Sequence, residues 1–299
     1  MRARADARSV AAMTARSIPA IALLALGAAA APADAAGFVY GGTTRDGDAI
    51  VLTAPKGAQK LAGAVIAWQA ACEDQSYFSD TSRLTALKPV VGVPIGPRDL
   101  LMTRNTKGRF TGIQALAEQS DTNTAAISVT VTGRLGRTTA SGTLSATVKI
   151  ADKATGAAVC SCQTGTLTLA AAHAPGTVYG GSTARDAPVV VHVAPQQRRV
   201  HDVLIGWDTQ SCTDGSYHVY PDVFQNFRLS RTGAFGDPFS YTANFDDGSK
   251  RAFNYDLRGR VTKTSARGTL HVTTADTDAA GAPGMTCDSG TIAWNAVTG

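Results

Sequence analysis

The stretch VYGGTTRD, from Val39 to Asp46, returns later in the same chain as VYGGSTARD, from Val178 to Asp186. Further matches follow each copy in the same order: VIAWQAACEDQSY with LIGWDTQSCTDGSY, SGTL with RGTL, and CQTGTLTL with CDSGTIAW. One such match arises easily by chance, whereas an ordered series indicates an internal duplication. We therefore expect two homologous units, residues 36–172 and 173–299, each beginning with a VYGG strand.

The periodicity within both units is that of β-strands. In TLSATVKI, from Thr143 to Ile150, every second residue is apolar, so one face is apolar and the other polar. The segment from Tyr241 to Leu257 alternates in the same way on both sides of the turn DDGS, which predicts a hairpin. Because no segment of either unit has a helical period, the sequence predicts an all-β protein of two tandem antiparallel β-sandwich or meander-barrel units.

The first 35 residues have the pattern of a signal peptide. Four arginines precede the apolar run from Ser17 to Ala31, and the small residues Ala33 and Ala35 flank Asp34 as at a cleavage site. A membrane-anchoring helix is the alternative, but the run is short and rich in alanine. We therefore expect a secreted, extracellular protein with no membrane span after residue 35.

The net charge of the chain is modest. It carries 28 Lys and Arg against 23 Asp and Glu, and removal of four arginines and two aspartates with residues 1–35 leaves +3. No basic run is longer than Arg198-Arg199. Because proteins that bind nucleic acid concentrate positive charge on one face, this spacing argues against a nucleic-acid partner.

The duplication predicts the pairing of the five cysteines. Cys72 matches Cys212 and Cys162 matches Cys287, so we expect one disulfide in each unit, Cys72–Cys162 and Cys212–Cys287. Cys160 has no counterpart in the second unit. It is expected either to be a buried free thiol or to form a covalent dimer.

A tryptophan precedes the first cysteine of each unit. Trp68 lies four residues before Cys72, a spacing that puts both on one face of a strand. Trp207 lies five residues before Cys212, so a β-bulge is expected there to restore the register.

The sequence contains none of the common catalytic motifs, such as Gly-x-Ser-x-Gly, His-Glu-x-x-His or a P-loop. The histidines lie in the linker and the second unit only, which excludes a duplicated histidine site. The loop DTDAAG, from Asp276 to Gly281, lacks the later ligands of a calcium loop and is expected to be a solvated turn. We therefore expect no cofactor and no metal, and the sequence leans against an enzyme.

The best candidate site is a pair of aromatic loops that follow the first cysteine of each unit. Aromatic rings beside carboxylates and hydroxyls are typical of sugar-binding surfaces, because a flat ring covers the apolar face of a sugar. Alternatively, these rings cover one end of the hydrophobic core. The candidate residues are Asp74, Tyr77 and Phe78 in the first loop and Asp214, Tyr217, His218 and Tyr220 in the second.

A second possibility is a hydrolase that acts on polysaccharides. Two carboxylates per unit recur, Asp46 with Asp74 and Asp186 with Asp214, and such pairs perform acid–base chemistry on glycosides. Against this, Arg-Asp after Gly-Gly and Asp after the cysteine are ordinary turn residues.

The combined pattern Tyr-Gly-Gly-x-Thr, Trp-x(3,4)-Cys and Cys-x-Ser-Gly-Thr resembles secreted repeat proteins of high-GC Gram-positive bacteria. The first unit departs from it, with Leu169 where the second has Trp294. The resemblance implies export and a repeated β unit, but no activity.

We therefore expect an exported two-unit binding or surface-interaction protein, with cell-wall glycan or a surface protein as its partner. The alternatives are the hydrolase and a structural or protein-partner module without a small ligand.

Overall fold

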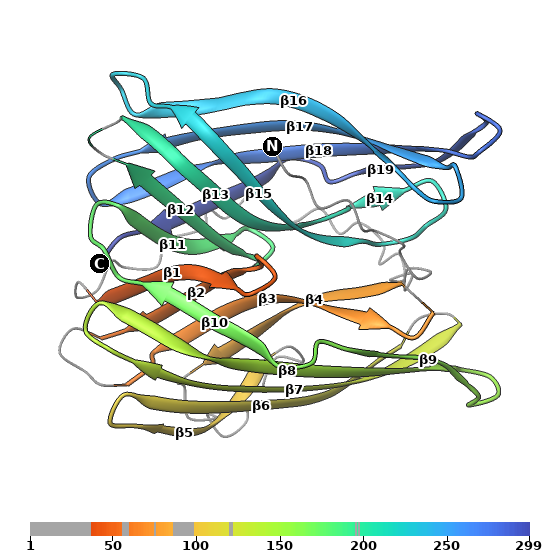
Figure 1. Cartoon of the computed structure of the whole chain (residues 1–299), viewed down its shortest axis with the longest axis horizontal. Coiled ribbons are helices and arrows are strands. Elements are labelled where there is room, and N and C mark those ends of the chain that lie inside the picture. Colours follow the sequence, from red (N-terminus) through yellow and green to blue (C-terminus); the bar gives the residue numbers. More distant parts are fainter. Residues whose placement is uncertain are drawn as a thin grey trace, which may run out of the picture.

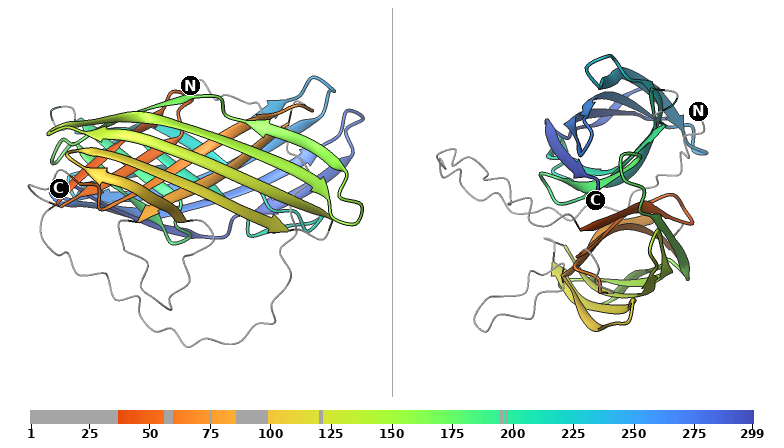
Figure 2. Two further views of the ribbon diagram at one scale, coloured as in Figure 1. Left: turned by 90° about the horizontal axis from the view of Figure 1, so that it is seen from below. Right: turned by 90° about the vertical axis from the view of Figure 1, so that its left-hand side faces the viewer.

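The computed structural model describes residues 37–55, 60–74, 76–85, 99–119, 122–194, 196 and 198–299. The predicted signal peptide, residues 1–35, lies outside the described residues. The chain forms two ten-stranded sheets, each curled around its own core, and the two lie side by side (Figures 1 and 2). The predicted all-β fold is therefore confirmed, and its two units are barrels. Within the described residues, no helix is long and apolar enough to cross a membrane.

Barrel 1 is a closed ring of nine strands with a tenth strand beside it. Strand β10 pairs with both β1 and β8, and β4 pairs with β5, so the ladder of hydrogen bonds runs around the ring without a break. Its strands are β1 (Phe38–Thr44), β2 (Ala49–Ala54), β3 (Gly63–Cys72), β4 (Tyr77–Thr85), β5 (Asp99–Thr106), β6 (Arg109–Gln119), β7 (Asn123–Leu135), β8 (Thr139–Asp152), β9 (Ala158–Gln163) and β10 (Leu167–Ala172).

Barrel 2 repeats this arrangement without a counterpart of β5. Strand β20 pairs with β11 and β18, but among the described strands no ladder joins β15 to β16, so the ring is open there. Its strands are β11 (Val178–Thr183), β12 (Pro188–Ala194), β13 (Arg199–Asp208), β14 (Ser211–Cys212), β15 (Val219–Arg228), β16 (Ala234–Asn244), β17 (Lys250–Val261), β18 (Ser265–Thr277), β19 (Pro283–Asp288) and β20 (Ile292–Val297).

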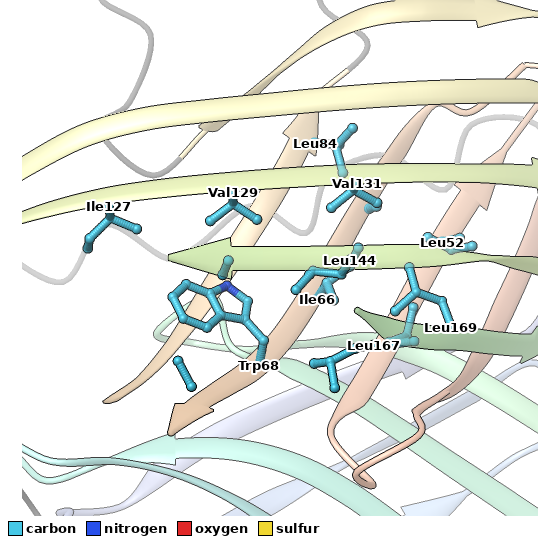
Figure 3. Packing of buried hydrophobic residues seen from close by; sticks show 14 of the residues in the cluster. Leu52, Ile66, Trp68, Leu84, Ile127, Val129, Val131, Leu144, Leu167 and Leu169 are labelled. Carbon is cyan, nitrogen blue, oxygen red and sulfur yellow. The ribbon is translucent and has the colours of Figure 1, made fainter. Parts of the chain in front are cut away.

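The alternating pattern places one face of each strand in a core. In β8, Leu144, Ala146, Val148 and Ile150 are buried, whereas the intervening residues are not. Figure 3 shows such side chains meeting inside barrel 1 around Trp68. The predicted hairpin around DDGS is also present, because β16 and β17 pair antiparallel on either side of that turn.

Both predicted disulfides are present. Cys72 of β3 lies directly opposite Cys162 of β9, and Cys212 of β14 lies opposite Cys287 of β19. Each bridge thus joins the end of an early strand to a late strand of the same barrel. The two bridges are compatible with an extracellular protein, because disulfides persist in oxidising environments.

The environment of the tryptophans and of Cys160 differs in one point from expectation. The prediction of a bulge between Trp207 and Cys212 is wrong. The strand is interrupted there instead: β13 ends at Asp208 and β14 starts at Ser211. Cys160 is a free thiol with 7 % of its surface exposed. This burial favours the buried thiol over the covalent dimer.

The VYGG strands bring the two barrels together. A Cβ atom on Gly41 would lie 2.7 Å from the Val178 side chain, and a Cβ atom on Gly180 would lie 2.7 Å from that of Val39. Each glycine therefore leaves room for the valine of the other VYGG strand, so the repeated VYGG segments form the contact between the two barrels. The apolar cluster between the barrels consists of Val39, Ala49, Val51, Val178, Val190 and Leu204.

Candidate functional site

The aspartates of the two predicted loops stabilise turns. Asp74 accepts hydrogen bonds from the backbone N–H of Ser76, at 3.1 Å, and from the Ser76 hydroxyl. These bonds hold the pKa of Asp74 below its ordinary value. Asp214 accepts from the N–H of Ser216 at 2.9 Å. Both carboxylates thus serve as turn residues.

Most of the aromatic rings of these loops pack toward the barrels. Phe78 stacks on Trp68 with ring centroids 6.0 Å apart, and Tyr220 stacks on Trp207 at 4.6 Å. His218 is 8 % exposed. The rings therefore do not form an open, flat platform in the loops, and Phe78 and Tyr220 act as covers of the core.

Tyr77 and Tyr217 are partly buried as well. The Tyr217 hydroxyl donates to Asp208 Oδ2 at 2.6 Å. Asp208 also binds Arg185, whose guanidinium reaches the carbonyl oxygen of Ser289 at 2.5 Å. The second predicted loop is thereby fastened to the start of barrel 2.

The predicted carboxylate pairs are separated by their contacts. Asp46 lies beside Arg45, at 3.5 Å and exposed, whereas Asp186 binds Arg83 of barrel 1 at 2.6 Å. Since Asp74 and Asp214 stabilise their own turns, each of the four carboxylates is committed to a turn or to an ion pair. This arrangement favours the structural interpretation of the four residues.

A different set of residues, inside the barrels, distinguishes the two units. Trp68 lies opposite Asp80 in the β3–β4 ladder, and Trp207 lies opposite Tyr220 in the β13–β15 ladder. Two residues further along, Ser82 of barrel 1 therefore corresponds to Asp222 of barrel 2. Both receive a hydrogen bond from the indole N–H, at 2.9 Å for Ser82 and 2.5 Å for Asp222.

Asp222 is the central polar group of barrel 2. Trp207 Nε1 and the Tyr255 hydroxyl, the latter at 2.9 Å, both donate to its Oδ2 atom. Burial raises the pKa of Asp222 to about 6, although the two hydrogen bonds favour the ionised form. In barrel 1, Ser82 instead donates to Gln114 Oε1 at 3.1 Å, so the equivalent network is uncharged.

Aromatic rings surround Asp222 where barrel 1 has smaller side chains. Phe110 of barrel 1 lies over Gly133, and Phe235 of barrel 2 lies over Gly259 in the same way. These two contacts show which residues of the paired strands occupy equivalent positions in the two barrels. The aligned pairs are Leu84 with Phe224, Gln114 with Phe239, Leu116 with Tyr241, Ile127 with Phe253 and Val129 with Tyr255.

These rings lie on both sides of the gap in the hydrogen-bond ladder between β15 and β16. Phe224 of β15 meets Phe239 of β16 edge to face at 5.5 Å, and Phe239 stacks on Tyr255 at 4.8 Å. Tyr241 stacks on Phe253 at 4.9 Å. Phe239 and Tyr241 are only partly buried. We call Tyr220, Asp222, Phe239, Tyr241 and Tyr255 the aromatic seam.

A buried ion pair holds Tyr220 in the aromatic seam. Arg251 is 6 % exposed and donates to both oxygens of Asp276, at 2.5 and 2.6 Å. Its third contact is to the Tyr220 hydroxyl at 2.8 Å. Barrel 1 has Ala125 and Ile150 at the positions of the ion pair, so it lacks this support.

The described residues include two clusters of side chains with possible metal-ligand atoms. Within each cluster the ligand atoms lie within 4.8 Å of one another. One cluster is Cys72, Cys160 and Cys162, and the other is Cys212, His218 and Cys287. In each group two sulfurs are joined in a disulfide, so one ligand atom remains. Asp276 of the predicted calcium-like loop is held by Arg251, which favours the turn.

A hollow of about 450 Å³ lies beside the Cys212–Cys287 bridge. Its lining consists of four threonines, a serine, an alanine, the two bridged cysteines and Asp288, whose carboxylate accepts a hydrogen bond from His271 at 2.8 Å. The hollow therefore has less binding chemistry than the aromatic seam. Of the seam residues, the sequence marked Tyr220 alone as a site candidate, because the others belong to strands rather than to a compact motif.

The comparisons with known proteins add no family. No family model matches the chain, and no curated protein matches it. A crystal structure of a Nitrosomonas europaea protein assigned as AttH is similar over 95 % of this chain and 99 % of that chain, with 11 % identity and a TM-score of 0.18. At that TM-score the similarity carries no argument about fold or function.

Proposed function

We propose that this chain is an exported binding protein and that the aromatic seam of barrel 2 is its ligand site. The observation that carries the proposal is the replacement of Ser82, Gln114 and Leu116 of barrel 1 by Asp222, Phe239 and Tyr241 on the same scaffold. The fold itself does not need this change, since barrel 1 fills its core mainly with aliphatic side chains, besides Tyr40, Trp68 and Phe110. The seam therefore points to a ligand.

The chemistry of the seam fits a carbohydrate. Among the described residues, hydrogen bonds reach only Oδ2 of Asp222, which leaves Oδ1 to accept from a ligand hydroxyl. The partly buried rings of Phe239 and Tyr241 offer apolar surface beside it. A sugar combines these needs, because it carries hydroxyl groups around a flat C–H face.

Binding is favoured over hydrolysis. Glycosidases use a pair of carboxyl groups that flank the scissile bond. The other carboxylate that contacts this part of the barrel, Asp276, is held by both of its oxygens in the pair with Arg251. Asp222 thus has no free carboxylate partner among the contacts of the seam.

The test is calorimetric titration of the disulfide-bonded protein with neutral cell-wall oligosaccharides. Tyr241→Ala removes a ring beside the gap between β15 and β16 and should weaken binding by about fivefold, since one stacked ring contributes on the order of 1 kcal/mol. Asp222→Asn should weaken it as well, because the carboxylate accepts stronger hydrogen bonds than an amide oxygen.

The matched control is Leu116→Ala, at the position of barrel 1 that corresponds to Tyr241. It should leave binding unchanged. Equal losses in Leu116→Ala and Tyr241→Ala would contradict a site in barrel 2. Release of soluble sugar that Asp222→Asn abolishes would replace the binding function with hydrolysis.

A further inference from the structure

The cations that are dispersed along the sequence gather in the folded chain. In barrel 2 they lie at the three turns β12–β13, β15–β16 and β17–β18 and on the strand ends beside them. They are Arg198, Arg199, Arg228, Arg231, Arg258, Arg260, Lys263 and Arg267. In barrel 1 the corresponding turns β5–β6 and β7–β8 carry Lys107, Arg109, Arg134 and Arg137.

Hydrogen bonds show that the three turns of barrel 2 are neighbours. The N–H of Leu229 donates to the carbonyl oxygen of Arg198 at 2.9 Å, which joins the first turn to the second. The N–H of Val261 donates to the carbonyl oxygen of Gly233 at 2.9 Å, which joins the second to the third. Their cations therefore share one rim.

The linker between the barrels connects this rim to its counterpart in barrel 1. The N–H of His173 donates to Thr138 O in the β7–β8 turn at 2.8 Å. The N–H of Gly176 donates to Thr298 Oγ1 at 3.0 Å, and the N–H of Thr298 donates to Thr264 O in the β17–β18 turn. The turns β7–β8 and β17–β18 thus lie at the same end of the molecule, the end that faces the viewer in the right panel of Figure 2. We call the end of the molecule that carries these twelve cations the basic end.

Several of these arginines face each other across strands. Like charges directly opposite one another destabilise a sheet. The opposed pairs are Arg109 with Arg134, Arg199 with Arg228, and Arg260 with Arg267. Of the twelve cations only Arg258 forms an ion pair with a carboxylate, that of Asp256 at 2.9 Å, in the part of the chain that the structure describes.

The other end of the barrels has the opposite charge. Its turns carry exposed carboxylates, among them Asp74, Asp214, Asp246, Asp247 and Asp278. A protein with one basic and one acidic end is oriented by the field of a charged partner before contact. Folding alone does not require this separation, since mixed charges on every turn would avoid the opposed arginines.

We propose that the basic end is a binding surface for an anionic polysaccharide, a chain that carries carboxylate, sulfate or phosphate groups along its length. Guanidinium groups suit such groups because their planar N–H donors match two oxygens at once. The three opposed arginine pairs span both barrels, so an extended polymer contacts more of them than a small anion does. The aromatic seam is not part of this surface.

Other polyanions fit the basic end less well. Binding of single-stranded nucleic acid uses exposed aromatic rings for base stacking. At this end Phe110, Phe227 and Phe235 are at most 9 % exposed, and the partly buried ring of Phe38 packs against Tyr40 and His173. Attachment to a membrane surface relies on apolar side chains that enter the lipid. Val297, 44 % exposed, is the one large apolar side chain of this kind among the described residues of the basic end.

The test is retention of the disulfide-bonded protein on immobilised heparin and polygalacturonate, two anionic polysaccharides, over a series of salt concentrations. The double variants Arg109→Glu/Arg134→Glu and Arg260→Glu/Arg267→Glu should each weaken binding about tenfold at low salt. Each should also lower the slope of the logarithm of the binding constant against that of the salt concentration, by about two.

Matched controls separate the surface from net charge and from the seam. Lys149→Glu/Lys250→Glu changes the charge equally on exposed lysines near the other end, and should leave binding within about twofold. Equal losses in this control would overturn the proposal. Tyr241→Ala should leave heparin binding unchanged, so failure here and failure of the proposed sugar site are distinguishable.

The same variants decide between partners. Tighter binding to a DNA duplex than to either polysaccharide at equal salt would assign the basic end to nucleic acid and overturn the proposal. Binding to vesicles that contain phosphatidylglycerol, without binding to the polysaccharides, would assign it to a membrane.

Discussion

Barrel 1 and barrel 2 have the same strand plan but different interiors and different closure. Barrel 1 is a complete ring around mainly aliphatic side chains, with the uncharged Trp68–Ser82–Gln114 network. Barrel 2 is open between β15 and β16 and holds Asp222, Arg251 and a group of aromatic rings. The difference teaches that the scaffold tolerates a charged, aromatic interior when the buried carboxylate and guanidinium receive hydrogen-bond partners.

The largest effect we expect is also the one that should be the same in both barrels. Replacing Cys72 and Cys162 by alanine opens a loop of 90 residues, and the same change at Cys212 and Cys287 opens one of 75 residues. On the chain-entropy model each loss costs about 4–5 kcal/mol of unfolding free energy. Denaturant titration of both double variants checks this, and a difference above about 2 kcal/mol would show that one barrel relies on its bridge far more than the other.

The next effect should occur in barrel 2 alone. Arg251→Ala leaves the carboxylate of Asp276 without its partner inside the barrel and removes the donor to Tyr220. Breaking a fully buried ion pair on one side costs about 3–5 kcal/mol, and because the Asp276 side chain is 25 % exposed we expect a loss near the lower end of this range. The unfolding free energy measures the loss.

The double variant Arg251→Met/Asp276→Leu is the control, because it removes both charges and should recover most of that loss. An Arg251→Ala protein as stable as the original would mean that the ion pair does not support the barrel.

A smaller effect concerns pH. The pKa of Asp222 is raised from 3.8 to about 6, so the folded state favours the protonated carboxyl. The stability contribution of this group is therefore complete below about pH 4 and is lost as the pH rises through 6, by at most about 3 kcal/mol. Asp222→Asn should be more stable relative to the original at pH 7 than at pH 4.

Thermal unfolding of the original protein and of Asp222→Asn at pH 4 and pH 7 checks this. The difference between the two proteins separates the contribution of Asp222 from the contributions of other titratable groups. Burial also raises the pKa of Asp48 in barrel 1 to about 6 and lowers the pKa of His218 in barrel 2, so the pH dependence that remains in Asp222→Asn reports on groups of both barrels. If stability depended on pH identically in the two proteins, the carboxyl group of Asp222 would be exposed to solvent rather than buried, which would contradict the prediction.

Sequence reasoning succeeded where the evidence lay within one strand or in the match between the two copies. The alternation in β8 predicted its buried face, and the order of matched segments predicted both disulfides. It failed over Trp207 and Cys212, since the spacing of five residues is equally consistent with a bulge and with the break that is present. The aromatic loops were the visible candidates because their rings are close in sequence, yet Phe78 and Tyr220 lie against tryptophans.

The amino-acid sequence by itself determined the duplicated β unit, the cysteine pairing and the apolar faces, because a period of two residues and a repeated order are properties of the linear chain. Only the tertiary structure decided that barrel 2 is open, that Asp222 meets Trp207 and Tyr255, and that twelve dispersed cations form one end. These features depend on the register between strands that lie far apart in the chain. That register is set by packing of the whole barrel rather than by any local pattern.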